Sequence, residues 1–152
     1  MTEIYVDADA CPVRDEVLKV AARHNVMTVF VSDGGIRPPN TPLAHIVIVS
    51  EGADAADNWI HDHVETGDVV VTNDIPLADR CLKKNAHVIR PDGRVINEDQ
   101  IGMALATRDL MTGLRETGTI TGGPAPFSRA DRSRFLNALE VILGKALKST
   151  KP

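Results

Sequence analysis

Five short apolar runs constrain the fold of this chain more than any other feature of its sequence. They cover residues 4–6, 26–31, 45–49, 68–72 and 87–90, and most of them are nearly continuous in Val and Ile. Continuous runs of this length are typical of strands that are buried on both faces. The sequence therefore predicts a mainly parallel sheet of about five strands, covered by helices on both sides.

Helical patterns lie between most of these runs. Residues 12–24, 53–64 and 75–84 are predicted to be helices, and Pro12 suits a first helical turn. The segment 32–44 is too rich in Gly and Pro for a helix and is expected to be a loop. Strands that alternate with helices in this order predict an α/β domain with three layers.

The last third of the chain predicts a C-terminal helical portion. A capping pattern at Asn97 and Gln100 predicts a helix that runs to about residue 112. A loop rich in Gly, Thr and Pro follows, in which residues 121–124 suit an anion-binding turn. Ser128 is expected to cap a further helix to about residue 147, whose apolar face packs onto the body. We find no internal repeat, and we expect residues 1–150 to form a single domain.

Acidic residues follow four of the five predicted strands. In an open α/β sheet the carboxyl ends of the strands share one edge, and ligands bind there. Carboxylates that crowd together repel one another, which requires a cation or raised pKa values. Hard divalent cations such as Mg²⁺ and Mn²⁺ prefer oxygen ligands of this kind. The acids are Asp7 and Asp9 after the first run, Asp33 after the second, Glu51, Asp54 and Asp57 after the third, and Asp74 and Asp79 after the fourth.

Structural roles are an alternative for several of these acids. Asp54 is a candidate N-cap, and its carboxylate and that of Asp57 would then satisfy helix amides only. Asp74 is a candidate cap of the helix that follows it. Asp33 precedes two glycines and is typical of a turn residue. Asp7, at the end of a buried run, is the hardest of the acids to explain in this way.

Four stretches of the sequence together resemble the uncharacterised YaiI/YqxD bacterial family. They are "VDADACPV" near the amino terminus, "GADAADNWI" in the middle, "TNDIPLA" after the fourth run and "GGPAPFSRADRSRF" in the last third. By resemblance this family is grouped with the PIN-like nucleases, which are metal-dependent enzymes that cut phosphodiester bonds, often in RNA. The resemblance implies a PIN-like fold and a phosphodiesterase or nuclease that acts on RNA or another nucleic acid.

The resemblance also assigns roles to particular side chains. Carboxylates would hold Mg²⁺ or Mn²⁺, which activates a water and stabilises the attacked phosphate. Basic side chains near the same edge are expected to hold phosphates of the substrate. The expected catalytic residues are Asp7, Asp57 and Asp74; the expected metal ligands are these three with Asp9 and Asp54, and Asp79 is a supplementary acid. The expected substrate-binding residues are Arg14, Arg37, Arg80 and Lys83.

Charge and cysteine usage bear on partners and location. The net charge of −4 does not indicate nucleic-acid binding by the chain as a whole, but without six site aspartates the remainder carries +2 and is mildly basic. The two cysteines form no CxxC pair and are expected to be packed residues. With no signal-peptide pattern and no run of membrane-helix length, we expect a cytoplasmic protein without membrane contact. The oligomeric state stays open.

Two other functions stay open. A haloacid-dehalogenase-type phosphatase also begins with a strand followed by D-x-D, in which Asp7 would be the nucleophile and Asp9 the general acid. That mechanism requires a lysine before its last acidic motif, and the chain has none between Lys19 and Lys83. A non-catalytic PIN-like module that binds RNA or a protein partner is the third possibility, although this chain keeps the acids that such a module would lose.

Overall fold

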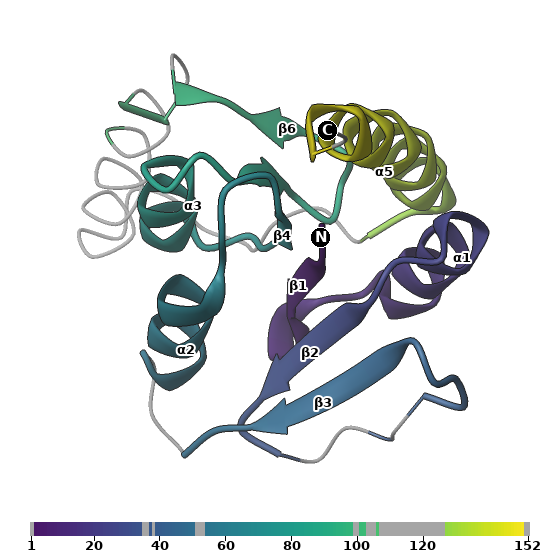
Figure 1. Ribbon diagram of the computed structural model, residues 1–152, viewed down its shortest axis with the longest axis horizontal. Helices are drawn as coiled ribbons and strands as arrows, with labels where there is room; N and C mark the ends of the chain where they lie inside the picture. The colour runs from purple at the N-terminus through teal and green to yellow at the C-terminus, as the bar shows by residue number, and fades with distance from the viewer. Residues whose placement is uncertain are drawn as a thin grey trace, which may run out of the picture.

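The computed structural model describes residues 2–34, 37, 39–50, 54–98, 101–102, 106 and 127–150. These residues contain one sheet with the strand order β3-β2-β1-β4-β5-β6 (Figure 1). All neighbouring strands from β3 to β5 pair in parallel, whereas β6 is antiparallel to β5. The strands are β1 (Ile4–Asp7), β2 (Thr28–Ser32), β3 (Ala44–Ile48), β4 (Val69–Val71), β5 (His87–Ile89) and β6 (Val95–Ile96).

The expected mainly parallel sheet is confirmed, and each of the five apolar runs overlaps one of its strands. The sixth strand, β6, was not predicted. It has only two residues, which is too short for a periodic pattern to reveal. The antiparallel pairing of β6 with β5 follows a tight turn through Gly93, whose φ of +94° is readily adopted only by glycine.

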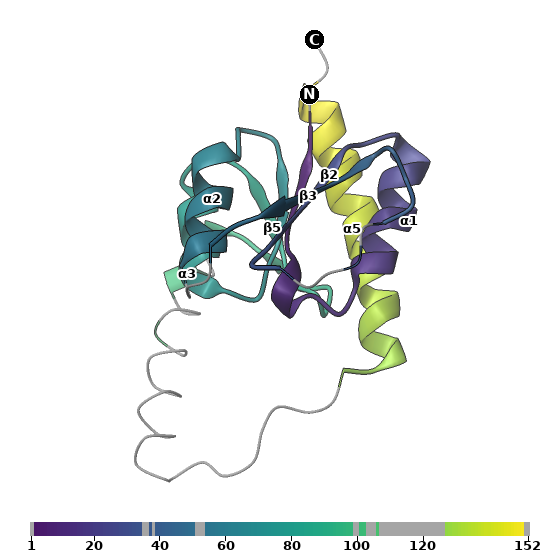
Figure 2. The same ribbon diagram turned by 90° about the horizontal axis from the view of Figure 1, so that it is seen from below.

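Helices cover both faces of the sheet, which confirms the three-layer α/β architecture. Figure 2 shows α1 and α5 on one side of the strands and α2 and α3 on the other. In the described part of 33–43, between β2 and β3, the chain forms no helix, as its Gly and Pro content predicted. The helices are α1 (Arg14–His24), α2 (Ala55–His63), α3 (Ile75–Leu82) and α5 (Arg129–Thr150).

Alternate residues of the central strands point into two separate cores. On the α1/α5 side, Val6 and Phe30 are buried with Phe135 of α5. On the α2/α3 side, Val31 is buried with Ile60 of α2. Full burial of one such side chain contributes about 1.5–3 kcal/mol. The near-continuous apolar runs are therefore explained by a sheet that is covered on both faces.

The strand order places β1 and β4 side by side at the point where the connections change direction. The chain leaves β1 through α1 to reach β2 on one side, and it later returns through α2 to β4 on the other side. Such a switch point opens a crevice at the carboxyl ends of the strands. Asp7 ends β1 at this position.

Two of the predicted helix starts, at Pro12 and after Ser128, have different outcomes. Helix α1 begins at Arg14 and not at Pro12, because a 3-10 turn over Ala8–Ala10 follows β1 directly. Ser128 does cap α5: Asp131 N donates to Ser128 Oγ at 3.2 Å, and Ser128 N donates to Asp131 Oδ2 at 2.9 Å. Most of the helix predicted over 97–112 and the turn at 121–124 lie outside the described residues.

Both cysteines are free and buried, as expected. Burial raises the pKa of Cys11 to about 11 and that of Cys81 to about 12, so both thiols stay protonated near neutral pH. No helix in the described parts of the chain combines the length and the apolar character that a membrane span needs.

Candidate functional site

Three aspartates from separate parts of the sequence influence one another at the carboxyl edge of the sheet. Asp7 ends β1, Asp57 lies in the first turn of α2, and Asp74 is the N-cap of α3. Burial, the negative charges of Asp74 and Asp7, and a hydrogen bond with Asp74 raise the pKa of Asp57 to about 6. Burial and the charge of Asp74 also raise the pKa of Asp7. We call Asp7, Asp57 and Asp74 the aspartate cluster.

Thr72 connects two members of the aspartate cluster. Its hydroxyl donates to Asp7 Oδ2 at 3.2 Å, and the same oxygen accepts a hydrogen bond from Asp74 N at 3.0 Å. The backbone of Thr72 is fixed in turn, because its N–H donates to Ile89 O on β5 at 3.1 Å. Sequence reasoning missed this residue, although a threonine that ends a run of buried valines directly before Asn-Asp was a usable signal.

Asp74 has both of the roles considered for it. Its Oδ1 accepts a hydrogen bond from Leu77 N at 2.8 Å and so caps α3. Its charge also contributes to the raised pKa values of Asp7 and Asp57. The cap holds the carboxylate at the edge of the sheet and does not remove it from the cluster.

Asp9 is bound to the end of β2. Ser32 Oγ donates to Asp9 Oδ1 at 2.6 Å, and Asp33 N donates to Asp9 Oδ2 at 2.9 Å. Although partial burial acts in the opposite direction, these bonds and the charge of Arg14 lower the pKa of Asp9. Asp9 therefore stays ionised, and its charge adds to the raised pKa of Asp7.

The remaining predicted acids lie further from the centre of the cluster. Asp54 is the N-cap residue of α2 and is exposed, but its side chain makes no capping hydrogen bond, so the alternative in which its carboxylate satisfies helix amides is not confirmed. Its charge nevertheless contributes to the raised pKa of Asp57. Asp79 pairs with Lys83 at 3.0 Å along α3. Glu51 lies outside the described residues.

The four predicted phosphate-binding side chains are not gathered at one point. Arg14 is exposed at the start of α1 and acts on Asp9. Arg37 is exposed after β2. Arg80 Nη1 donates to Asn58 Oδ1 on α2 at 3.1 Å, whereas Lys83 is engaged by Asp79.

The donor chemistry of the aspartate cluster suits a hard divalent cation. Burial and the repulsion between neighbouring carboxylates raise the pKa values of Asp7 and Asp57, and a cation would relieve that repulsion. Within the described ranges, however, no three His, Cys, Asp or Glu side chains are already arranged around one point as metal ligands. Mg²⁺ commonly keeps several waters and takes only one or two carboxylates. Asp7, Asp57 and Asp74 are thus the residues that would hold such an ion, with water completing the coordination.

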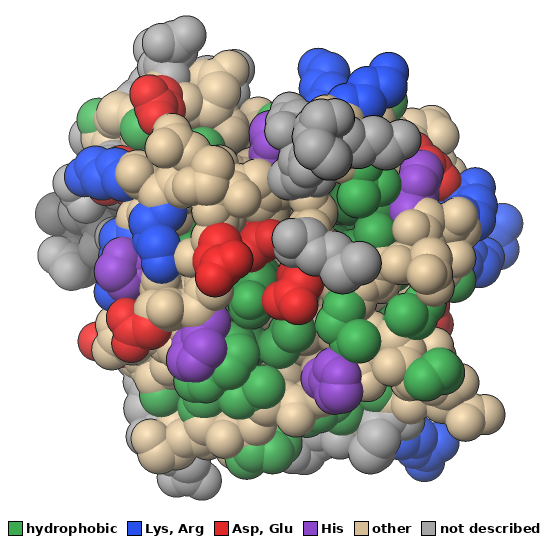
Figure 3. Space-filling model, viewed as in Figure 1, with side chains coloured by type: hydrophobic (Ala, Val, Ile, Leu, Met, Phe, Trp, Pro, Cys, Tyr) green, Lys and Arg blue, Asp and Glu red, His purple; other side chains and the backbone are tan. Residues whose placement is uncertain are grey.

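The opposite edge of the sheet also carries a buried acid, Asp68, which is satisfied by backbone amides. The carboxylate of the buried Asp68 accepts hydrogen bonds from Glu3 N at 3.0 Å and Glu65 N at 2.8 Å. Figure 3 views the molecule from the side of the N-terminus marked in Figure 1, and acidic side chains lie near the centre of that face. Since amides already satisfy Asp68, its role is to join β1 to the start of β4.

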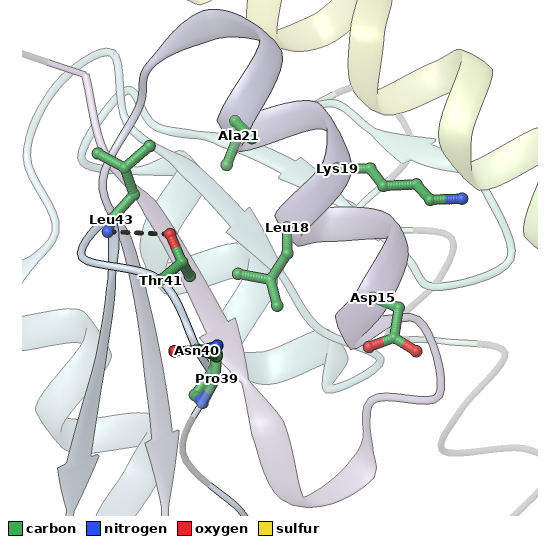
Figure 4. Close-up of a pocket in the computed structure, with 9 residues that line it drawn as sticks. Asp15, Leu18, Lys19, Ala21, Pro39, Asn40, Thr41 and Leu43 are labelled. Atoms are coloured by element: carbon green, nitrogen blue, oxygen red, sulfur yellow. Dashed lines mark hydrogen bonds between the residues drawn. The ribbon is translucent and has the colours of Figure 1, made fainter.

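A separate pocket with a volume of about 520 Å³ lies between α1 and the segment before β3 (Figure 4). Leu18 and Ala21 face Pro39 and Leu43 across it, and among the described residues that line it Asp15 is the one with a carboxylate. No member of the aspartate cluster lines this pocket. Since a mostly apolar wall offers little to a charged reaction, we place the candidate chemistry at the aspartate cluster.

The fold and the cluster together define a class: three-layer α/β proteins that carry interacting carboxylates at the carboxyl edge of a parallel sheet. The profile described as "Uncharacterized BCR, YaiI/YqxD family" matches residues 5–145, and the chain belongs to this family. No solved structure matches the chain.

Relatives in several bacteria match almost the whole chain. A UPF0178 protein of Paramagnetospirillum magneticum is 54% identical over 146 residues, which is 96% of this chain and 97% of the relative. One from Rhodopseudomonas palustris is 56% identical over 140 residues, covering 92% of this chain and 89% of the relative. A third, from Mesorhizobium japonicum, is 55% identical over 149 residues, or 98% and 96%.

Proposed function

We propose that this protein is a divalent-metal-dependent phosphodiesterase of the PIN-like type that cleaves RNA. The observation that carries the proposal is the meeting of Asp7, Asp57 and Asp74 at the carboxyl edge of the sheet, where Thr72 joins Asp7 to the backbone of Asp74. Burial and the charges of Asp74 and Asp7 raise the pKa of Asp57 to about 6. Strongly perturbed carboxylates at the ligand-binding edge of an α/β sheet are typical of functional sites. Cleavage of an anionic phosphodiester is favoured by a positive charge at the phosphate, and a divalent cation attracted by this cluster would supply that charge.

The three aspartates share one role in the proposed reaction, which is to hold the cation. Asp7 and Asp74 are held by hydrogen bonds to Thr72 and Leu77, so their free oxygens are preorganised ligands. Asp57, in the first turn of α2, would complete the set of carboxylates around the ion. A bound Mg²⁺ or Mn²⁺ ion supplies Lewis acidity at the phosphate.

The contacts of Asp9 favour a phosphodiesterase over a phosphatase of the haloacid-dehalogenase type. In the phosphatase mechanism Asp9 would donate a proton to the leaving group. Here two hydrogen bonds from Ser32 and Asp33 favour the ionised carboxylate and lower its pKa. A carboxylate held in this state is a poor general acid at neutral pH.

The experiment is a Mn²⁺-dependent cleavage assay with three substrates: labelled single-stranded RNA, bis(p-nitrophenyl) phosphate and p-nitrophenyl phosphate. We expect the wild type to cleave both diesters. Asp74→Asn keeps an oxygen that can cap α3, and we expect it to cleave them about a hundredfold more slowly or worse. Turnover of the monoester alone would replace the proposal with a phosphatase. Mn²⁺-independent RNA binding without any cleavage would favour a binding module.

A further inference from the structure

Arg90 lies at the same edge of the sheet as the aspartate cluster. It directly follows β5, whose residue Ile89 pairs in register with Val71 of β4. Thr72 directly follows Val71. Its backbone N–H donates to Ile89 O, and its hydroxyl donates to Asp7 Oδ2. Arg90 is therefore one strand away from the Thr72–Asp7 contact.

The position of Arg90 is fixed through both its backbone and its side chain. Arg90 N donates to Arg94 O at 2.8 Å, and Gly93 N donates to Arg90 O at 2.9 Å, which closes the turn between β5 and β6. Its Nε donates to Asn73 Oδ1 at 3.2 Å. Asn73 stands between Thr72 and Asp74 in the chain, so the guanidinium is tied to the segment that carries the cluster.

No carboxylate in the described part of the chain forms an ion pair with Arg90. The nearest acid along the turn, Asp92, binds Arg94 at 2.7 Å instead. Burial and the positive charge of Arg94 lower the pKa of Arg90, although the charge of Asp92 acts in the opposite direction. A half-buried guanidinium in such surroundings has capacity for an anion that none of the described residues supplies.

Arg90 stands beside the aspartate cluster and not within it. The side chain of Arg90 donates to Asn73. Among the described residues, no hydrogen bond or ion pair joins it to Asp7 or Asp74, which are held by Thr72 and Leu77. An anion bound by Arg90 is therefore separate from the group that the cluster would act on.

We propose that Arg90, positioned by Asn73, binds a backbone phosphate of an RNA strand next to the phosphate that lies at the aspartate cluster. This inference rests on the proposed function, because the strand must cross the cluster to reach both positions. Arginine binds phosphate through paired N–H donors, and Nε is already engaged by Asn73, which leaves the terminal nitrogens for the ligand. Contact with a flanking phosphate gives binding energy that the ground state and the transition state share.

The test compares Arg90→Gln with the parent on a long and a short substrate. On single-stranded RNA we expect KM to rise about tenfold while kcat changes little. On bis(p-nitrophenyl) phosphate, which has no flanking phosphate, kcat/KM should be unchanged. Arg90→Lys should restore part of the RNA affinity, since it keeps the charge but loses the paired donors. Arg23→Gln, at the opposite edge and paired with Glu140, is the matched control and should leave both substrates unaffected.

A binding measurement separates this inference from the proposed function. Fluorescence anisotropy with a labelled single-stranded RNA oligonucleotide is performed in the Asp7→Asn background, with and without Arg90→Gln. We expect Arg90→Gln to weaken RNA binding about tenfold. We also expect the slope of log Kd against log salt concentration to fall by about 0.7, which corresponds to one lost phosphate contact. Equal affinities in the two proteins, or no RNA binding by either, would overturn the inference. If Arg90→Gln weakens RNA binding but the wild type cleaves no diester, the Arg90 contact is supported and only the proposed nuclease activity is contradicted.

Discussion

The hydroxyl of Thr72 donates a hydrogen bond to Asp7 Oδ2 at 3.2 Å and so joins the carboxyl ends of β4 and β1. The same oxygen accepts from Asp74 N at 3.0 Å. One buried side chain thus sets the positions of two carboxylates that the sequence separates by more than sixty residues.

The first prediction concerns Thr72→Val, which keeps the shape of the side chain but removes both hydrogen bonds. We expect the free energy of unfolding to fall by about 1–3 kcal/mol, because Asp74 N loses a buried acceptor. We also expect weaker Mn²⁺ binding, since Asp7 loses the bond that favours its ionised form. Urea unfolding and Mn²⁺ titration measure the two effects.

Thr66→Val is the control, because Thr66 is exposed and its hydroxyl contacts only Lys84 O among the described residues. If Thr66→Val lowered the free energy of unfolding as much as Thr72→Val does, a special role for Thr72 would be contradicted.

The second prediction separates the cap from the charge at Asp74. Asp74→Ala removes the acceptor for Leu77 N and should lower stability by about 1 kcal/mol. Asp74→Asn keeps an oxygen for the same amide and should unfold close to the wild type, yet it should lose cation affinity as fully as Asp74→Ala does. Chemical denaturation and calorimetric titration of both variants test this. Full Mn²⁺ affinity in Asp74→Asn would show that this carboxylate has only a capping role.

The third prediction is a pH dependence of stability in the absence of metal. The folded-state pKa of Asp57, about 6, lies above the ordinary value of 3.8, so the native protein binds more protons than the unfolded chain between these values. Stability should therefore fall as pH rises from about 4 to 6. After allowance for the exposure of Asp57 to solvent, the loss should be about 1 kcal/mol. Urea unfolding in EDTA at pH 4.5 and pH 7 should show that Asp57→Asn removes much of this loss. A wild type and variant with the same pH slope would exclude the coupling.

The fourth prediction concerns the turn that holds Arg90. A Cβ at Gly93 would come within 2.7 Å of the backbone carbon of Arg134 in α5, and φ is +94°. We expect Gly93→Ala to lower stability by about 2 kcal/mol or more. At Gly144, inside α5, a Cβ would meet no atom within 4 Å, so Gly144→Ala should raise stability by up to about 1 kcal/mol. Thermal unfolding of Gly93→Ala and Gly144→Ala tests whether Gly93 lies against the backbone of Arg134. Similar melting temperatures for the two variants would refute this contact.

The fold was largely predictable from the sequence, because the physical signals were long and repeated. Continuous Val and Ile runs identified the five main strands, and the glycines and prolines of 32–44 ruled out a helix there. The first residue of α1 was misplaced, because nothing local indicates that Ala8–Ala10 forms a 3-10 turn. Strand β6 depends on a turn at Gly93 that packs against α5, which is a tertiary contact.

The site was predictable in part. The acids at strand ends were visible because parallel strands bring their carboxyl ends to one edge. The cap that Asp74 gives to α3 was among the alternatives, whereas the bond from Ser32 to Asp9 and the lack of a capping bond at Asp54 could not be seen in the local sequence. Thr72 was missed although its place directly before Asn-Asp was a usable signal. Arg90 was missed because its contact with Asn73 depends on the pairing of β5 with β4, which the local sequence does not reveal.

The measurement that tests the central claim most directly is a calorimetric titration of Mn²⁺ into the wild type, Asp57→Asn and Asp62→Asn at pH 7. Asp62 lies on the same helix and its side chain is 68% exposed, so its variant loses the same charge away from the cluster. We predict that the wild type and Asp62→Asn bind Mn²⁺ with similar affinity and that Asp57→Asn binds at least about tenfold more weakly. Equal affinity in all three proteins, or no binding by the wild type, would contradict a cation site formed by Asp7, Asp57 and Asp74.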